Sequence, residues 1–308
     1  MNGARFLLRR LVQGLVSILG ASLIIFVISR LSGDPVALLV PADAPASVIA
    51  DIRTRFGLDL PLWRQYLIFL GNALTGDFGN SYRWQMPALR LILDRLPATV
   101  ELAICGLIFS VAIAVPVGVL SAVHRGGWID RLGRVFAMLG QAMPAFWVGL
   151  LLILVFAIRL NWLPAFGQGG VDHLILPSIA LGWYPVAAQT RVVRSAMLDV
   201  LDSDHIRLAR ALGTPERLIV WKYALRNAAI PLLTMLGVYF AAMLGGAFVV
   251  ETIFAWPGVG RTVVEAVFSR DFPVVQAGVL FTSILFVLSN LLVDLGYGLV
   301  DPRIRDAR

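Results

Sequence analysis

Residues that could do chemistry are few in this sequence, and their spacing forms no catalytic constellation. His124, His173 and His205 each fall at the edge of an apolar stretch, where a place among lipid headgroups explains them. No G-x-x-x-x-G-K-[ST] phosphate loop, H-E-x-x-H zinc pair or G-x-S-x-G nucleophile motif occurs. The sequence therefore predicts that the chain is not an enzyme, binds no metal or other cofactor, and cannot hydrolyse a nucleoside triphosphate by itself.

A few polar side chains lie inside apolar stretches of the sequence. Gln141, Tyr184 and Gln189 could line a polar path, although hydrogen bonds between neighbouring helices explain them equally well. Glu101 and Asp294 are ionisable groups near the ends of apolar segments. For these two we expect a structural role, because each lies close enough to an interface to be solvated or paired.

The composition indicates that a lipid bilayer surrounds most of the chain. Of the 308 residues, 58% are hydrophobic and only 15% are charged, which argues against a soluble globular domain. The net charge is +7, and Lys222 is the single lysine among 26 basic residues. A basic protein can bind nucleic acid, but here the arginines flank apolar segments, which is typical of membrane topology. We therefore expect the bilayer, and no nucleic acid, as a partner.

Segment length predicts an all-α membrane protein with six transmembrane helices, since roughly 20 apolar residues cross a bilayer. The helices are expected near residues 8–30, 98–122, 133–159, 174–193, 228–251 and 274–299. The fourth contains Pro177, Gly182 and Pro185, so we expect it to be bent, with its freed backbone groups facing protein or water.

The chain divides into three parts. They are an N-terminal transmembrane helix at 1–30, an outer loop region at 31–97 and a five-helix core at 98–308. In the outer loop region, helices are expected over Ala46–Phe56 and from Pro61 to about Leu74, which favours a small folded cap over a passive linker. Arginines are concentrated on the side that carries the N-terminus, so both termini are predicted to be cytoplasmic.

The longest polar interruption of the apolar second half runs from Asp199 to Pro231, and we call it the knob. Its residue order predicts helix, glycine, helix. Gly213 suits the left-handed backbone that ends a helix, and Thr214–Pro215 can start the next one. Leu201, Leu208 and Leu212 fall on one apolar stripe of the first helix. The knob is predicted to be cytoplasmic, and a loop resting on lipid headgroups is the plain alternative.

A second informative stretch runs from Glu251 to Pro273, and we call it the outer segment. Its run F-A-W-P-G-V-G at 254–260 combines aromatic residues with proline and glycine. Aromatics suit the membrane interface, and proline and glycine suit a re-entrant turn, followed here by a short helix over 261–268. An ordinary interfacial loop explains the same composition.

The motifs of the chain, taken together, resemble a known family: the integral-membrane permease subunits of bacterial ABC importers for peptides and nickel. The resemblance covers nearly the whole chain, and the order and spacing of its motifs make it specific. They are G-D-P at 33–35, G-L-D-x-P at 57–61, G-D-F-G at 76–79, L-P-A-T-x-E-L at 96–102, E-T-I-F-x-W-P-G-x-G at 251–260, R-D-x-P-V-V-Q at 270–276 and D-P-R-I-R at 301–305.

The resemblance implies a type I ABC importer transmembrane domain, multi-pass, in the bacterial inner membrane. The implied complex also holds a second homologous permease as heterodimer partner, two cytoplasmic ATP-binding subunits that carry ATP and magnesium, and an extracytoplasmic substrate-binding protein. The solute would be a dipeptide, an oligopeptide or a related molecule such as a nickel chelate, an opine or glutathione. The sequence does not distinguish these solutes.

The resemblance also implies roles for single residues. The knob becomes the loop, residues 199–226, that engages the ATPase subunits, with Asp204, Arg207, Ala209, Arg210, Gly213, Glu216 and Arg217 as candidates. The outer gate and binding-protein contact would comprise Glu251, Phe254, Trp256, Pro257 and Gly258. The superfamily pattern E-A-A-x-x-x-G has Arg207 and Leu208 in place of the glutamate and first alanine, so a salt bridge from that glutamate is not carried over.

Two other functions compete with the importer. An ion-coupled secondary transporter usually shows internal repeats and charges at the membrane midplane, and the sequence shows neither. A membrane-embedded enzyme is opposed by the missing catalytic groups.

Overall fold

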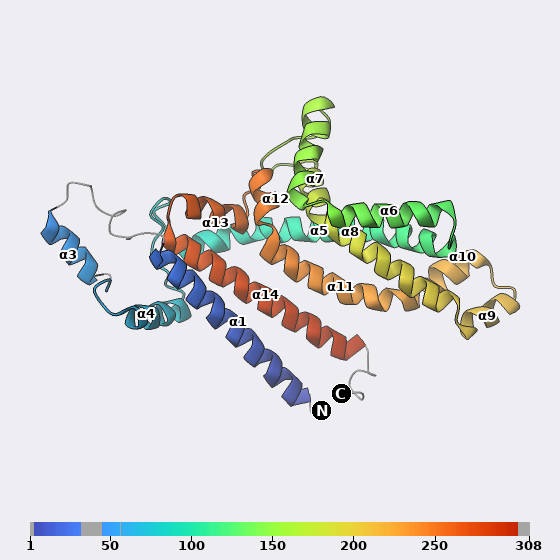
Figure 1. The fold of residues 1–308 in the computed structure, drawn as a ribbon, viewed down its shortest axis with the longest axis horizontal. Helices are drawn as coiled ribbons and strands as arrows, with labels where there is room; N and C mark the ends of the chain where they lie inside the picture. The colour runs from blue at the N-terminus through green and yellow to red at the C-terminus, as the bar shows by residue number, and fades with distance from the viewer. Residues whose placement is uncertain (1–2, 32–44, 56, 301–308) are drawn as a thin grey trace.

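The computed structural model describes residues 3–31, 45–55 and 57–300, which are almost entirely helical (Figure 1). The long helices are α1 (Gly3–Leu31), α5 (Ala88–Val123), α8 (Val171–Leu201), α11 (Leu225–Gly246) and α14 (Phe272–Val300). The shorter ones are α3 (Ala46–Arg55), α4 (Leu62–Thr75), α6 (Trp128–Ala142), α7 (Ala145–Leu152), α9 (Asp204–Ala211), α10 (Glu216–Leu218), α12 (Phe248–Ile253) and α13 (Val259–Phe268), with π-helical turns η1 (Ile153–Arg159) and η2 (Ile219–Ala224).

The predicted all-α class is confirmed. Within the described ranges the chain forms no strand beyond an isolated bridge between Asn80 and Pro87. The motifs at 33–35 and 301–305 lie outside the described residues, and so does the side chain of Asp294.

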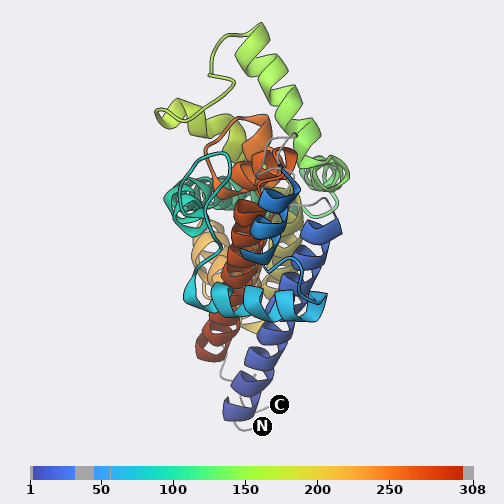
Figure 2. The ribbon, with the colours of Figure 1, turned by 90° about the vertical axis from the view of Figure 1, so that its left-hand side faces the viewer.

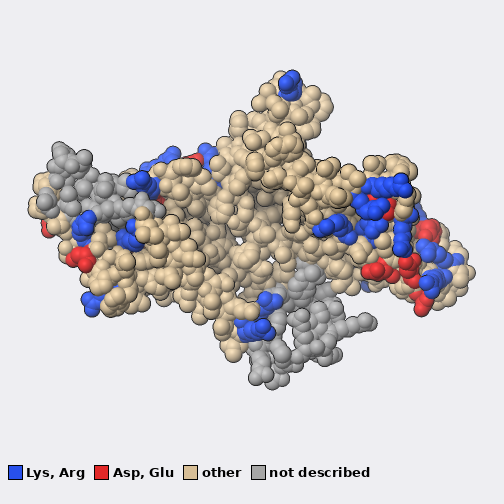
Figure 3. All heavy atoms as spheres, in the orientation of Figure 1, with Lys and Arg blue, Asp and Glu red and all other residues tan. Residues whose placement is uncertain are grey.

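Several helices are long and apolar enough to cross a membrane. Four qualify singly within the described residues: Leu8–Leu31, Ala88–Val123, Glu216–Gly246 and Phe272–Val293. Charged side chains gather around the knob, around the 46–83 region and at the start of α1, with few in between (Figure 3). This distribution matches a protein whose middle lies in lipid.

The one helix expected at 133–159 is broken in two. α6 and the continuous α7–η1 helix qualify together as a fifth span, but they are bent by 104° at a short break. Met143 takes an extended backbone there, with φ −93° and ψ 118°, because the following Pro144 disfavours the helical conformation. The second half therefore stands away from the body of the molecule (Figures 1 and 2).

The helix expected at 174–193 is longer than predicted and is not interrupted. α8 keeps Pro177 and Pro185 inside a single run of 31 residues. It is not among the apolar spans, and α5, α6, α7 and α11 all pack against it. Because much of α8 meets protein rather than lipid, it can carry polar residues such as Gln189 that a lipid-facing helix would exclude.

Two predicted boundaries also move. α5 begins at Ala88, ten residues before the expected 98, because the charged stretch ahead of the apolar residues continues the same helix. The second helix of the knob is not separate: α10, η2 and α11 run on from Glu216 to Gly246 as one candidate span.

The most extensive contact between helices joins α5 to α8. Glycines make it possible. A Cβ added to Gly182 would lie 2.6 Å from the carbonyl oxygen of Gly106 and 2.8 Å from the ring of Phe109. A Cβ on Gly118 would lie 2.8 Å from the side chain of Val193. The two backbones thus approach more closely than larger residues allow, which is a common way for membrane helices to associate.

The helices predicted in the outer loop region are present as α3 and α4, and α4 lies across α1 (Figure 2). The hydroxyls of Tyr66 and Ser22 are 2.8 Å apart, and the rings of Phe69 and Phe26 stack at 5.8 Å. Beyond α4, the buried Asp271 accepts a hydrogen bond from the Ser81 hydroxyl at 2.5 Å. The part of the region from α4 onward is therefore held at two places, against α1 and against the residue that precedes α14.

Gly182→Ala should destabilise the protein, because the new methyl group meets backbone atoms that cannot move aside. We expect the free energy of unfolding to fall by about 1–3 kcal/mol, as overpacking does elsewhere. Gly20→Ala is the matched control, since nothing lies within 4 Å of its Cβ position. The measurement is thermal unfolding of the purified variants in detergent, and equal midpoints for the two would contradict the packing described here.

Candidate functional site

The knob is anchored to the bundle by its first helix, α9. Ile206 is fully buried and joins a cluster with Met197 of α8 and Ile219 of η2. Ala209 packs against the same cluster from its edge. α9 is therefore fixed to the end of α8 by one narrow apolar side, and the remainder of its surface faces outward.

The turn after α9 is closed by backbone hydrogen bonds and by an ion pair. Gly213 has φ +78°, which confirms the left-handed conformation expected from its place in the sequence. The amides of Gly213 and Thr214 donate to the carbonyls of Arg210 and Ala209 at 3.0 and 3.1 Å. Across this turn, the Arg210 guanidinium makes two bonds to the Glu216 carboxylate, at 2.7 and 3.3 Å. Hydrogen bonding to Glu216 is the main cause of the raised pKa of Arg210.

The outward surface of the knob carries leucines as well as charged side chains. Leu208 and Leu212, expected on an apolar stripe with Leu201, are 61% and 76% exposed, while Leu201 is buried. α9 protrudes from the molecule (Figure 1), so only the side carrying Ile206 can reach the body. Exposed leucines therefore stand among the charged side chains of the knob.

The charged candidates of the knob are all exposed. Asp204 and Arg207 pair with each other at 3.2 Å, and Arg217 is exposed beyond the turn. These pairs lie in water and contribute little stability. The exposed surface of the knob is thus formed by both apolar and charged side chains.

The end of the bundle near the knob holds a buried ion pair that sequence reasoning missed. Asp130 of α6, 1% exposed, accepts two bonds from the Arg194 guanidinium of α8 at 2.7 and 2.9 Å. It also accepts from the amide of Gly126, at 3.0 Å, and so closes the turn between α5 and α6. Three helices are joined at this point. Residues 64 positions apart in the chain gave no local signal of the contact.

The outer segment is built around a buried carboxylate. Glu251 is fully buried; its Oε1 accepts from the Thr99 hydroxyl at 2.7 Å and its Oε2 from the amide of Arg261 at 3.0 Å. Arg261 lies in the first turn of α13, where the helix dipole favours a negative charge. Burial raises the pKa of Glu251, and the hydrogen bonds from Thr99 and from the amides of Arg261 and Gly260 oppose that effect.

Glycine and tryptophan complete this arrangement. A Cβ on Gly258 would lie 2.3 Å from the Glu251 carboxylate, so only glycine fits there. The Trp256 indole is fully buried and donates from Nε1 to the carbonyl of Ala98 at 2.8 Å. Phe254, 1% exposed, packs against Gly149 of α7.

Most of the residues expected at the outer gate and binding-protein contact lie inside the protein. Glu251, Phe254, Trp256 and Gly258 are buried, and only Pro257 is partly exposed. A partner protein therefore cannot touch the four buried residues in this conformation. The short helix expected at 261–268 is present as α13, which begins two residues earlier because the capping carboxylate organises its first turn.

The three path candidates lie in different surroundings. Tyr184 is half exposed and contacts Tyr239 edge to face, with ring centroids 6.3 Å apart. Gln141 is partly buried on α6. Gln189 is fully buried inside the bundle, and neither polar atom of its amide has a hydrogen-bond partner. Of the three, Gln189 thus does not line an open surface in this conformation.

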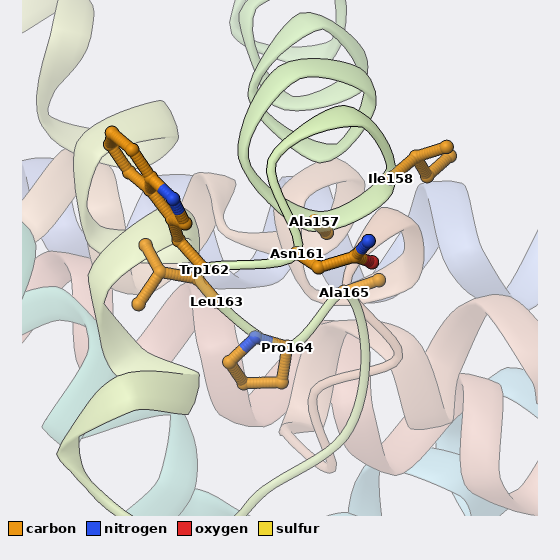
Figure 4. A pocket seen from close by; sticks show the side chains of 7 residues that line it. All are labelled: Ala157, Ile158, Asn161, Trp162, Leu163, Pro164 and Ala165. Atoms are coloured by element: carbon orange, nitrogen blue, oxygen red, sulfur yellow. The ribbon is translucent and has the colours of Figure 1, made fainter.

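Two cavities within the described residues are lined by none of the site candidates. A pocket of about 390 Å³ lies after η1 and is lined by residues 157–158 and 161–165, with Asn161 as its polar side chain (Figure 4). A groove of about 560 Å³ lies between α1, α11 and α14, and none of the candidates lines it. The described residues contain no group of three or more His, Cys, Asp or Glu side chains that could hold a metal ion.

Comparison with known proteins gives matches along the whole chain. Residues 114–306 match the family described as binding-protein-dependent transport system inner membrane component, and residues 3–103 match the N-terminal part of such membrane components. The dipeptide transport system permease protein of Alkalihalophilus pseudofirmus is 39% identical over 97% of this chain and 99% of its own. The glutathione transport system permease protein of Pectobacterium atrosepticum is 42% identical over 97% and 98%.

A solved structure of an amino acid ABC transporter with histidines is also similar. Its TM-score is 0.48 at 20% sequence identity, and the match covers 67% of this chain and 92% of that one.

Trp256→Phe should lower the stability of the protein while keeping most of the buried ring. The lost bond to Ala98 is expected to reduce the free energy of unfolding by about 1–3 kcal/mol. Trp147→Phe is the control, because Trp147 is 45% exposed. The unfolding midpoints of both purified variants are compared with the parent protein. A larger shift for Trp147→Phe would contradict the structural role of the Trp256 indole.

Proposed function

Because the chain belongs to the family of binding-protein-dependent transport system inner membrane components, we propose that it is one of two permease subunits of an ATP-driven importer. Its relatives are permeases of dipeptide and glutathione transport systems. The solute is accordingly a peptide or a similarly small peptide-like molecule. The chain supplies the path through the membrane, and partner subunits supply ATP hydrolysis.

The knob is the observation that carries this proposal. It is a short helix held at a fixed angle on the end of α8 by Ile206, with exposed leucines and charged groups directed away from the body. Such a surface suits a groove on a soluble partner. We assign that partner as one of two cytoplasmic ATP-binding subunits, where ATP and magnesium bind.

Membership of the family supports a proposal for the rest of the complex. A second, homologous permease completes the path as a heterodimer, and an extracytoplasmic binding protein delivers the solute to the opposite face. Both termini and the knob lie in the cytoplasm, in keeping with the distribution of arginines. Closure of the ATP-binding subunits moves the knob, and α8 with α5 carries this movement toward the outer segment.

The direct test is uptake of a labelled dipeptide or of glutathione by vesicles that hold the complete complex. Uptake should require ATP on the side of the membrane that carries the ATP-binding subunits, and the binding protein on the opposite side. ATP-independent uptake driven by an ion gradient would contradict the proposal.

Gly213 allows a sharper test of the knob. Nothing lies within 4 Å of its Cβ position, so a substitution acts through backbone strain alone, at about 1–3 kcal/mol for a β-branched residue. Gly213→Val should leave insertion intact but reduce both co-purification of the ATPase subunits and uptake. Gly213→Asn should retain more of each, since asparagine tolerates the left-handed conformation. Equal uptake by both variants and the parent would show that the angle of the knob is unimportant.

A further inference from the structure

Thr99 stands where α5 meets the outer segment, and its hydroxyl makes two hydrogen bonds. Its Oγ1 lies 2.7 Å from Glu251 Oε1 and 2.9 Å from the amide nitrogen of Val259. The amide can only donate, so Oγ1 accepts there and its single hydrogen points at Glu251. Thr99 is 2% exposed, so water does not replace either bond. The hydroxyl therefore joins α5 to α12 and to the first residue of α13 at one atom.

The surroundings leave the Glu251 carboxylate little freedom to move. Its other oxygen accepts from the amide of Arg261, and Gly258 and Gly260 lie so close that a Cβ would stand 2.3 and 2.9 Å from carboxylate oxygens. The hydrogen bonds from Thr99 and from the amides of Arg261 and Gly260 stabilise the carboxylate and oppose burial, which favours the neutral acid.

The same turn of α5 holds the outer segment a second time, through the carbonyl of Ala98 and the Trp256 indole. From this turn α5 continues without a break to Val123, packed closely on α8, whose far end carries the knob. A movement of the knob and α8 can therefore reach the outer segment through α5, provided that this attachment is rigid.

We infer that Thr99 is a positioning residue for transport: its hydroxyl keeps the outer segment attached to α5 by holding the Glu251 carboxylate at the start of α13. This inference rests on the proposed function. Thr99 contacts no solute; it acts through Glu251 and α13. Without its hydroxyl, the outer segment keeps only the bond between Trp256 and Ala98 to this turn of α5, and it follows α5 less rigidly when the path opens and closes.

The attachment should depend on pH, because Glu251 can be protonated. Burial raises the pKa of Glu251, and the Thr99 hydrogen bond lowers it, so removal of Thr99 raises it further. A raised pKa favours the folded state as pH falls, and this contribution is lost as pH rises through the folded pKa. Protonation of Glu251 therefore does not by itself destabilise the folded protein, and a loss of uptake in acid that is absent from Glu251→Gln reports the loss of this carboxylate.

Other charged groups around α12 are few. α7 carries no charged residue, and on α13 the Arg261 guanidinium and Glu265 pair with each other at 2.8 Å. α8 contributes Asp172 and His173 at its first turn. On α5, the nearest carboxylate in sequence is Glu101, which contacts Gln168 at 3.4 Å. Burial and hydrogen bonds, rather than a neighbouring charge, account for the pKa of Glu251.

The test compares Thr99→Val, which keeps the shape but removes the hydroxyl, with Thr99→Ser, which keeps the hydroxyl. Ser110→Ala is the matched control, because Ser110 is a buried hydroxyl of α5 that donates within its own helix, to the carbonyl of Leu107 at 2.8 Å. Uptake of a labelled dipeptide or of glutathione by the complete complex in proteoliposomes is measured from pH 5 to 8, roughly the range in which proteins are most stable.

Thr99→Val should reduce uptake at pH 7 several-fold while ATP hydrolysis continues. Uptake should fall as the pH is lowered, and we call this fall the acid limb. The pH at its midpoint should be higher in Thr99→Val than in the parent by about one unit, as expected for loss of one hydrogen bond to a charged group. Thr99→Ser and Ser110→Ala should match the parent. Glu251→Gln, which cannot titrate, should lack this acid limb, and it keeps the test open if Thr99→Val does not assemble.

Hydrogen exchange of the complex separates failure of this inference from failure of the proposed function. Amides 259–261 should exchange faster in Thr99→Val than in Thr99→Ser, whether or not the complex transports. If the parent complex takes up neither probe, the proposed function fails and exchange alone decides the role of Thr99. Parent-like uptake, acid limb and exchange in Thr99→Val would overturn the inference.

Discussion

The close approach of α5 and α8 is the constraint on which the rest of the structure depends. Gly106, Gly118 and Gly182 remove side chains from the contact, and the carbonyl of Gly106 occupies the space that a methyl group on Gly182 would need. In a bilayer, where lipid tails are as apolar as leucine, such packing replaces the hydrophobic effect as the force between helices. Because the two helices are long and closely packed, the features at their opposite ends are held in a fixed relation.

The knob and the outer segment, at these two ends, are stabilised by different interactions. The knob depends on one left-handed glycine and on an exposed pair between Arg210 and Glu216, so water and partner proteins can compete for its charges. The outer segment depends on a buried carboxylate whose bonds are all internal. The knob is exposed, so a soluble partner can bind it, whereas the outer segment is buried and keeps its shape. This combination suits a subunit that transmits a movement through the membrane.

Local sequence patterns were sufficient to predict some of these features. The positive φ of Gly213 followed from a helix ending just before Thr214–Pro215, and α3 and α4 followed from helical spacing with glycine and proline at their ends. The break of the third span was missed although Pro144 marks it, because the apolar run on both sides satisfied the length criterion. Hydrophobicity alone cannot distinguish one straight helix from two bent ones.

Long-range contacts could not be predicted in the same way. The bond between Thr99 and Glu251 joins residues 152 positions apart, and the pair of Asp130 and Arg194 spans 64. The exposure of Leu208 was also missed, since periodicity shows that residues share a face but not which face meets the body. Aromatic and glycine content marked the outer segment as special, yet its burial appears only once α5 is in place.

The most direct measurement of the central claim, that the knob and the outer segment lie on opposite sides of the membrane, is cysteine accessibility in intact cells. In a Cys105→Ser background, His205→Cys reports on the knob and Phe268→Cys on the end of α13, because both side chains are exposed. A membrane-impermeant maleimide added outside should label the cysteine at 268 and reach the one at 205 only after the membrane is opened. Labelling at 205 in intact cells would contradict the account, since the knob could then not contact a cytoplasmic ATPase.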